Sequence, residues 1–173
     1  MKVFRAALAA LAVAGTLLSA AQAANTALSV EANNAYLQAN ATKKGVVVLP
    51  SGLQYNIIHN GFGKRPGITD LVTVQYTGWL INGTMFDGTE ESLPAQFKVT
   101  DVIPGWTQAL LLMREGDKWH IVVPPHLGYG ARGAGQGAIP PNQTLVFDVT
   151  LVATTTPKEP EKKPDTSTGN SED

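Results

Sequence analysis

The fold is decided by residues 72–88, which read VTVQYTGWLINGTMFDG. Val72, Val74 and Tyr76 alternate with threonine and glutamine, and this period of two predicts a β-strand with one buried face. The pair Asn82-Gly83 follows, and it favours a tight hairpin because both residue types tolerate positive φ angles. The stretch therefore predicts an antiparallel hairpin whose first strand contributes one face to a core.

Further strands are indicated on both sides of this hairpin. Alternating apolar residues recur in residues 53–57, 97–99, 119–123 and 145–151, and residues 46–49 form a short β-branched run. One apolar stripe per strand is typical of an antiparallel sheet that is covered on a single face. We expect about five strands in one sheet.

One helix is predicted to cover that sheet. It opens at Pro104-Gly105 and places Trp106, Ala109, Leu110 and Met113 at spacings of 0, 3, 4 and 7, so that they share one helical face. The elements together predict an α+β domain over residues 46–156, with a five-stranded antiparallel sheet and one short helix.

Composition excludes several classes of function. The chain has 173 residues, with 13 Lys and Arg against 14 Asp and Glu, and no cysteine. This balance argues against nucleic-acid binding, which depends on excess cations that displace counterions. The absence of cysteine excludes disulfides, thiolate metal sites and a cysteine nucleophile. Three scattered histidines predict no metal site, and no organic cofactor is implied.

The N-terminal end is predicted to be a targeting segment. Residues 1–23 carry two cations, an uncharged apolar run over residues 6–20 and the small-x-small ending Ala21-Gln22-Ala23, as in a secretory signal peptide cleaved before Ala24. The alternative is a membrane anchor, but the run is shorter than the roughly 20 residues that span a bilayer. We expect cleavage and no membrane anchor afterwards.

Two polar segments flank the predicted domain. Residues 24–45 predict a short helix or linker ending at Gly45, with Lys43 and Lys44 in the last helical turn, where cations suit the helix dipole. Residues 157–173 contain no aromatic and no large aliphatic side chain. They predict a disordered tail, because they cannot bury enough surface to offset their ordering entropy.

Common catalytic patterns are absent from the sequence. No serine lies in a Gly-x-Ser-x-Gly elbow. The glycines at 133, 135 and 137 lack the lysine and following helix of a phosphate-binding loop. What remains is a set of aromatic residues beside turns with one acid, Asp87, among them. By alternation alone, the simplest interpretation is that these aromatic residues belong to the core.

These residues carry a resemblance to a known family. The run VQYTGWL at residues 74–80, followed by Gly83 and Phe86-Asp87, resembles the first signature of FKBP-type peptidyl-prolyl isomerases. Further similar motifs follow in the family's order: VIPGW at 102–106, LGYG at 127–130, IPPN at 139–142 and TLVFDV at 144–149. GVVVLPSGLQ at 45–54 further resembles the Mip-like and FkpA-like bacterial subgroup, in which a long helical stalk precedes the catalytic domain.

The resemblance implies a strongly bent five-stranded sheet around the helix, and a cleft that accepts a prolyl ring. It makes Trp106 the floor of the cleft, Tyr129 a hydrogen-bond donor to the substrate and Asp87 a lone acid at its edge. The implied wall and substrate-contact residues are Tyr76, Phe86, Val102, Ile103, Ile139 and Phe147. The backbone N–H of Ile103 is expected to bind a substrate carbonyl. For Asp87 an alternative stays open, because Asp87-Gly88 is also a turn pair.

Three departures from the family pattern concern the cleft. Ala95 stands where the family often has an aromatic residue after the proline at 94, which predicts a thinner wall. No arginine occurs in residues 88–93, so Asp87 is expected to lack a charged partner. Residues 131–138 are glycine-rich, which predicts a looser flap over the cleft.

The predicted partners are proline-containing polypeptides and inhibitors of the tacrolimus and rapamycin type, and the predicted location is the periplasm or exterior of a bacterium. Two other interpretations stay open: a periplasmic chaperone-like module with little turnover, and a structural β domain. Only residues 24–44 precede Gly45, and their apolar residues do not form heptads. We therefore expect a mainly monomeric protein.

Overall fold

A computed structural model of the chain describes residues 27–90 and 92–157. The predicted signal peptide at residues 1–23 and residues 158–173 of the predicted tail lie outside the described residues. Within the described ranges, no helix has the length and apolarity needed to cross a membrane.

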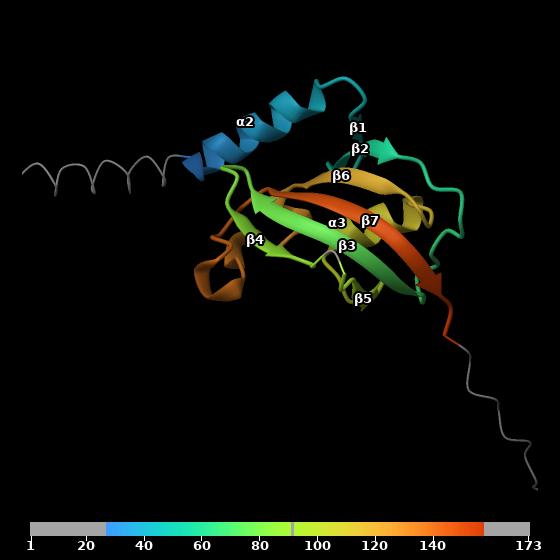
Figure 1. Ribbon diagram of the computed structural model, residues 1–173. Coiled ribbons are helices and arrows are strands. Elements are labelled where there is room, and N and C mark those ends of the chain that lie inside the picture. The colour runs from blue at the N-terminus through green and yellow to red at the C-terminus, as the bar shows by residue number, and fades with distance from the viewer. Residues whose placement is uncertain (1–26, 91, 158–173) are drawn as a thin grey trace, which may run out of the picture.

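The domain is built on one antiparallel sheet (Figure 1). Its strands are β1 (Val47–Val48), β2 (Gln54–His59), β3 (Leu71–Leu80), β4 (Met85–Gly88), β5 (Ala95–Lys98), β6 (Lys118–Val123) and β7 (Leu145–Thr155). The order is β1-β2-β6-β7-β3-β4, and β5 also pairs with β3. The α+β class is confirmed, but the sheet has seven strands where five were expected. β1 spans only two residues, and the chain that runs back along β3 is divided into the short strands β4 and β5. Strands this short do not show a full alternation of apolar and polar residues.

The two long central strands set the register of the sheet. β3 pairs with β7 from Leu71 opposite Thr155 to Leu80 opposite Leu145, with an irregularity between Thr73 and Val74. After the hairpin turn, the chain runs back along β3 in two separate strands, first β4 and then β5, and each of them pairs with β3. The β4 pairing brings Asp87 opposite Gly78.

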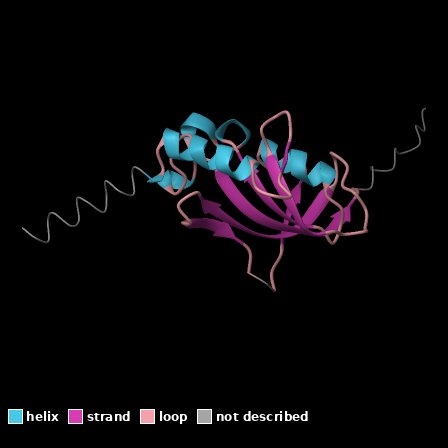
Figure 2. Cartoon of the chain, turned by 90° about the horizontal axis from the view of Figure 1, so that it is seen from above, coloured by secondary structure: helices cyan, strands magenta, loops and turns pink. Residues whose placement is uncertain are grey.

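Helix α3 (Pro104–Leu112) covers one face of this sheet, as the apolar spacing predicts, and Figure 2 shows the helices on one side of the curved strands. Trp106, Ala109, Leu110 and Met113 are all buried in the core. The contact is close at Gly105, where a Cβ atom would meet Val123 Cγ1 at 2.6 Å. Only glycine lets the first turn of the helix approach the sheet this closely.

A second helix, α2 (Val30–Ala41), precedes the sheet. Its N-cap is Ser29, whose hydroxyl accepts a hydrogen bond from the Ala32 N–H at 3.2 Å. The helix ends at Ala41, and Lys43 and Lys44 lie in the following turn, so their expected position in the last helical turn was wrong. The turn at Gly45 adopts a φ of 84°, which accounts for glycine at that point.

The connection between β6 and β7 carries three short 3₁₀ helices. They are η1 (Pro125–Leu127), η2 (Gly130–Arg132) and η3 (Gly135–Gly137), and η2 and η3 occupy much of the glycine-rich stretch at residues 131–138. Gly133 closely approaches the Ile139 carbonyl, where a Cβ atom would lie at 2.3 Å. Residues 128–142 form the segment that we call the flap.

Candidate active site

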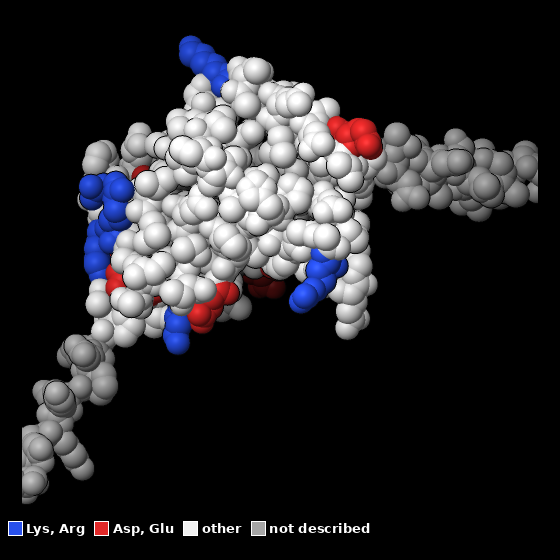
Figure 3. All heavy atoms as spheres, turned by 180° about the vertical axis from the view of Figure 1, so that it is seen from behind, with Lys and Arg blue, Asp and Glu red and all other residues white. Residues whose placement is uncertain are grey.

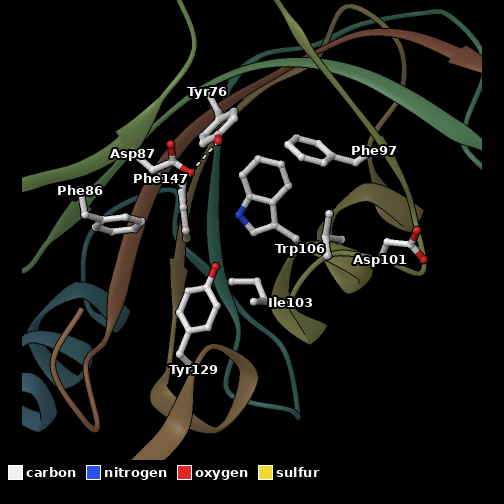
Figure 4. Close-up of a pocket in the computed structure, with 10 residues that line it drawn as sticks. Tyr76, Phe86, Asp87, Phe97, Asp101, Ile103, Trp106, Tyr129 and Phe147 are labelled. Atoms are coloured by element: carbon white, nitrogen blue, oxygen red, sulfur yellow. Dashed lines mark hydrogen bonds between the residues drawn. The ribbon is translucent and has the colours of Figure 1, made fainter. Parts of the chain in front are cut away.

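A cavity of about 360 Å³ opens between the N-terminal end of α3 and the strands β3, β4, β5 and β7 (Figure 4). Ten residues line it: Tyr76, Phe86, Asp87, Phe97, Asp101, Val102, Ile103, Trp106, Tyr129 and Phe147. Eight of the nine residues that the sequence singled out are therefore brought together at one site.

Trp106 forms the centre of this aromatic cluster. It lies in the first turn of α3 and is 4% exposed. Its ring makes edge contacts at nearly right angles with Tyr76 at 5.0 Å, Phe147 at 5.3 Å and Phe97 at 6.1 Å between centroids. Aromatic rings favour this edge-to-face geometry. Three neighbours thus fix the orientation of the indole, and its N–H has no acceptor among the described residues.

One wall depends on a glycine in β3. Phe86 and Phe147 pack edge to face with centroids 5.5 Å apart. At Gly78 a Cβ atom would come within 2.8 Å of both rings. The glycine of the motif at residues 74–80 therefore makes room for two phenylalanines, and a larger residue would displace them.

The acid at the cavity edge is bound to a tyrosine. The Tyr76 hydroxyl donates to Asp87 Oδ2 at 2.7 Å, and Asp87 Oδ1 accepts from the Gly88 N–H at 2.9 Å. Burial raises the pKa of Tyr76, and the hydrogen bond to Asp87 and the charge of that acid raise it further. Tyr76 is therefore protonated at neutral pH and keeps the carboxylate in place.

Tyr129 enters the site from the flap. It is 41% exposed, and Figure 4 shows its hydroxyl pointing into the cavity. Burial raises the pKa of Tyr129, with a smaller effect from the charge of Asp87, so the phenol stays a donor at neutral pH. The Tyr129 carbonyl accepts from the Gly133 N–H, and the Asn142 N–H donates to the Gly130 carbonyl. These two bonds hold the flap at the tyrosine and directly after it.

A backbone donor faces the same space. Ile103 is the N-cap of α3, and its carbonyl accepts from the N–H groups of Trp106 and Thr107. The Ile103 N–H has no acceptor within residues 27–90 and 92–157. The cavity thus offers two donors, the Ile103 N–H and the Tyr129 hydroxyl, to a ligand carbonyl.

The structure also identifies residues that the sequence did not. Phe97 on β5 lines the cavity two positions after Ala95, on the same face of the strand, whereas Ala95 is not among the lining residues. Its place in the alternating pattern was the available signal. Asp101 lines the rim and accepts a hydrogen bond from the Thr100 hydroxyl at 2.9 Å. Ile139, expected to contact substrate, is instead buried and bonded to Ala134 inside the flap.

The charged groups around the site are few. In the part of the chain that the structure describes, Asp87 forms no ion pair. No group of three or more His, Asp or Glu side chains that could hold a metal ion occurs there either. The site is an apolar aromatic chamber with two acids, Asp87 and Asp101, and a few neutral donors at its edge.

Comparison with known proteins gives consistent matches. The family model of the FKBP-type peptidyl-prolyl cis-trans isomerase matches residues 63–152, and the model of the domain amino terminal to it matches residues 3–57. The chain is 55% identical over 121 residues to the outer membrane protein MIP of Legionella longbeachae, covering 69% of this chain and 52% of that protein. It is 52% identical over 118 residues to the FKBP-type 22 kDa peptidyl-prolyl cis-trans isomerase of Escherichia coli, covering 68% and 57%.

Solved structures show the same fold. The crystal structure of FkpA from Escherichia coli matches with a TM-score of 0.69 and 38% identity, covering 84% of this chain and 69% of that one. The chain spans about half the length of the curated relatives it matches. The family model covers strands β3 to β6, most of β7, α3 and the residues that line the cavity, and this chain belongs to the FKBP-type peptidyl-prolyl cis-trans isomerase family.

Proposed function

We propose that this protein is a peptidyl-prolyl cis-trans isomerase that accelerates rotation about X-Pro bonds in polypeptides and so assists their folding. The observation that carries the proposal is the aromatic cavity with Trp106 at its centre. Its aromatic lining and neutral donors suit the binding of an amide better than the cleavage of one.

The reaction needs no covalent chemistry. Rotation about a peptide bond costs about 18–20 kcal/mol, because the planar amide is stabilised by resonance. At the top of the barrier the amide has lost this resonance, and its carbonyl oxygen carries less negative charge. A water-poor apolar site therefore favours the twisted amide over either planar form, and such differential binding is what accelerates a reaction.

Eight of the ten lining residues have a part in this scheme. Trp106 lies beneath the prolyl ring, and Phe86, Val102 and Phe147 enclose it. The Ile103 N–H and the Tyr129 hydroxyl bind carbonyl groups on either side of the rotating bond, which holds the flanking chain while the bond turns. Asp87, held by Tyr76, places its negative charge beside the amide, where it discriminates between the planar and the twisted charge distributions.

A protease-coupled assay with a proline-containing tetrapeptide tests the proposal. The wild-type chain from Ala24 should accelerate isomerisation, and Trp106→Ala should lower kcat/KM by about tenfold or more, a loss of about 1.4 kcal/mol in transition-state stabilisation. Trp79→Ala is the matched control, because Trp79 lies on β3 but does not line the cavity. Equal activity of wild type and Trp106→Ala would overturn the site assignment.

A binding measurement beside this assay tests the alternative of a chaperone-like module. That alternative predicts binding of proline-containing peptides, measured by calorimetry, without acceleration of isomerisation. The hydrogen-bonded Tyr76–Asp87 pair favours the enzyme, since simple capture of a prolyl ring does not need a held carboxylate.

Three finer proposals accompany the activity. Inhibitors of the tacrolimus and rapamycin type should occupy the cavity and compete with substrate. The protein should be periplasmic or secreted, which the signal-peptide pattern at residues 1–23 supports and cell fractionation can test. It should be mainly monomeric, because α2 packs on its own domain through Asn33 and Asn40, and light scattering after size exclusion can test this.

A further inference from the structure

A second hollow lies at the other end of α3. We call it the distal groove, and it has a volume of about 560 Å³. Its apolar surface comes from Ile57, Phe62, Leu112 and Trp119, and its charged groups include Arg65 and Arg114. Trp106 and Ile103 mark the N-terminal end of α3, whereas Leu112 is its last residue, so the active-site cavity and the distal groove lie at opposite ends of one helix.

The most exposed large apolar side chain of the described residues belongs to this groove. Phe62 is 93% exposed, and it lies on the loop between β2 and β3. Exposed apolar residues that line a hollow and are rimmed by charges commonly mark binding sites. The exposure of Phe62 indicates a binding surface only if the loop is held in a conformation that presents the ring to solvent.

The loop is fixed on both sides of the phenylalanine. The Gly61 N–H donates to Asp117 Oδ1, and the Gly63 N–H donates to the Glu115 carbonyl at 3.1 Å. The Gly61 Cα is so close to the neighbouring chain that a Cβ atom would lie 2.2 Å from the Glu115 carbonyl oxygen. The backbone at Phe62 is therefore held in place, so little backbone entropy remains to be lost when a ligand binds its exposed ring.

The charged side chains that line the groove are two arginines, Arg65 and Arg114, and one acid, Asp117. Asp117 Oδ2 accepts from the Arg114 N–H at 2.7 Å, and Glu115 Oε1 accepts from the Thr154 N–H at 2.6 Å. The local acids are thus bound to backbone groups, and neither Arg65 nor Arg114 forms an ion pair within the described ranges. Figure 3 shows Lys and Arg side chains gathered at one edge of the molecule, on the side where Figure 1 places the β2–β3 loop.

We propose that the distal groove binds a second segment of the same client polypeptide, an extended segment in which an aromatic or aliphatic residue stands beside Asp or Glu. The apolar side chain would lie against Phe62 and Leu112, and the carboxylate would pair with Arg65 or Arg114. This inference rests on the proposed isomerase function, because the client is the polypeptide whose X-Pro bond lies in the cavity.

The separation of the two sites determines which clients reach both. The nine residues of α3 span about 13.5 Å at 1.5 Å per residue. An extended chain covers at most about 3.3–3.6 Å per residue, so at least four residues must separate the proline from the second contact. A tetrapeptide therefore occupies the cavity alone, whereas an unfolded protein engages both sites and gains from the high effective concentration of the second contact.

Two substrates separate the groove from the cavity. Phe62→Ser and the pair Arg65→Gln with Arg114→Gln should lower kcat/KM by about fivefold or more for a protein whose refolding is limited by prolyl isomerisation, which is the size of effect expected for an interface anchor. The same variants should leave tetrapeptide turnover unchanged. Val152→Ser is the matched control, because Val152 is exposed on β7 and lies outside the groove.

A binding measurement completes the test without relying on turnover. A proline-free ten-residue peptide of alternating Phe and Glu should bind the wild-type chain from Ala24, and the double arginine variant should bind it at least about fivefold more weakly. Equal losses on tetrapeptide and protein, no loss on either, or equal peptide binding by both chains would overturn the groove. If the wild type accelerates neither substrate, the proposed function fails while the peptide measurement still decides on the groove.

Discussion

The two helices of this protein are held by opposite means. On α3 every buried side chain is apolar, and Trp106, Ala109 and Leu110 lie in the core cluster. On α2 the buried residues are Asn33 and Asn40, at 1% and 2% exposure. One helix is attached by the hydrophobic effect, and the other is fixed largely by amide hydrogen bonds.

The amides of α2 bind two separate parts of the domain (Figure 1). Near the start of the helix, the Asn33 amide donates to Gln143 Oε1 at 3.2 Å, and Asn33 Oδ1 accepts from the Thr144 N–H at 2.6 Å. Near its end, Asn40 donates to Gln54 Oε1 at 2.9 Å, and Gln54 donates in turn to the Leu37 carbonyl. Hydrogen bonds in a buried site are directional, so they define the position of a helix that has little apolar surface.

The largest effect should come from α3. Leu110→Ala should lower the free energy of unfolding by about 2–5 kcal/mol, because it leaves a cavity in a fully buried site. Leu145→Ala in β7 should cost a similar amount, since Leu145 is equally buried. Urea unfolding measures both. Val30→Ala on α2 is the control and should change stability by less than about 0.5 kcal/mol, because Val30 is half exposed. A similar loss for Val30→Ala would remove the contrast between the helices.

The amides should give the next largest effect. Asn33→Ala and Asn40→Ala should each destabilise by about 1–3 kcal/mol, because each leaves buried partners without a hydrogen bond. The pair Asn40→Leu with Gln54→Leu should recover most of the loss, since both polar partners are then replaced together. If the double variant is as unstable as Asn40→Ala with Gln54 intact, the hydrogen bond is not the reason for the loss.

Substitution of Asp87 should lower activity and leave stability unchanged, in contrast to the substitutions of the two buried asparagines on α2. Asp87→Asn should slow tetrapeptide isomerisation by about tenfold, equivalent to about 1.4 kcal/mol, because the amide keeps the shape but loses the charge beside the substrate. Its Tm should stay close to that of the wild type, whereas the variants of Asn33 and Asn40 lower it. A fall in Tm with normal turnover would instead support a turn-capping role for Asp87, given its bond to the Gly88 N–H.

The smallest effect is a dependence on alkaline pH. The pKa of Tyr76, which packs on α3, is raised by burial and by Asp87, and the pKa of Tyr36 on α2 is raised by burial alone. An unfolded tyrosine titrates near pH 10, so the stability that both phenols contribute is complete below that pH and is lost as pH rises above it. Urea unfolding between pH 8 and 11 should therefore show a decline that Tyr76→Phe reduces more than Tyr36→Phe does. Equal slopes in the two variants would contradict the assigned causes.

The sequence alone determined the sheet-and-helix plan and most of the site. The alternation in residues 72–80 and the spacing of Trp106, Ala109, Leu110 and Met113 report which side chains share a face, and burial follows from that. Eight of the nine site residues that the family motifs imply line one cavity in the structure. Local pattern suffices here because the strand and the helix each place chemically similar side chains at a fixed period.

Only the tertiary structure decided how distant segments meet. It placed Phe97 beside Trp106 and kept Ile139 inside the flap. It buried Asn33 against Gln143, which lies 110 residues away in the sequence. From composition alone, both residues are ordinary surface amides. Hydrophobic periodicity describes one element at a time, whereas a ring contact or an amide hydrogen bond depends on the position of a partner on another element. That position follows from the packing of the whole domain.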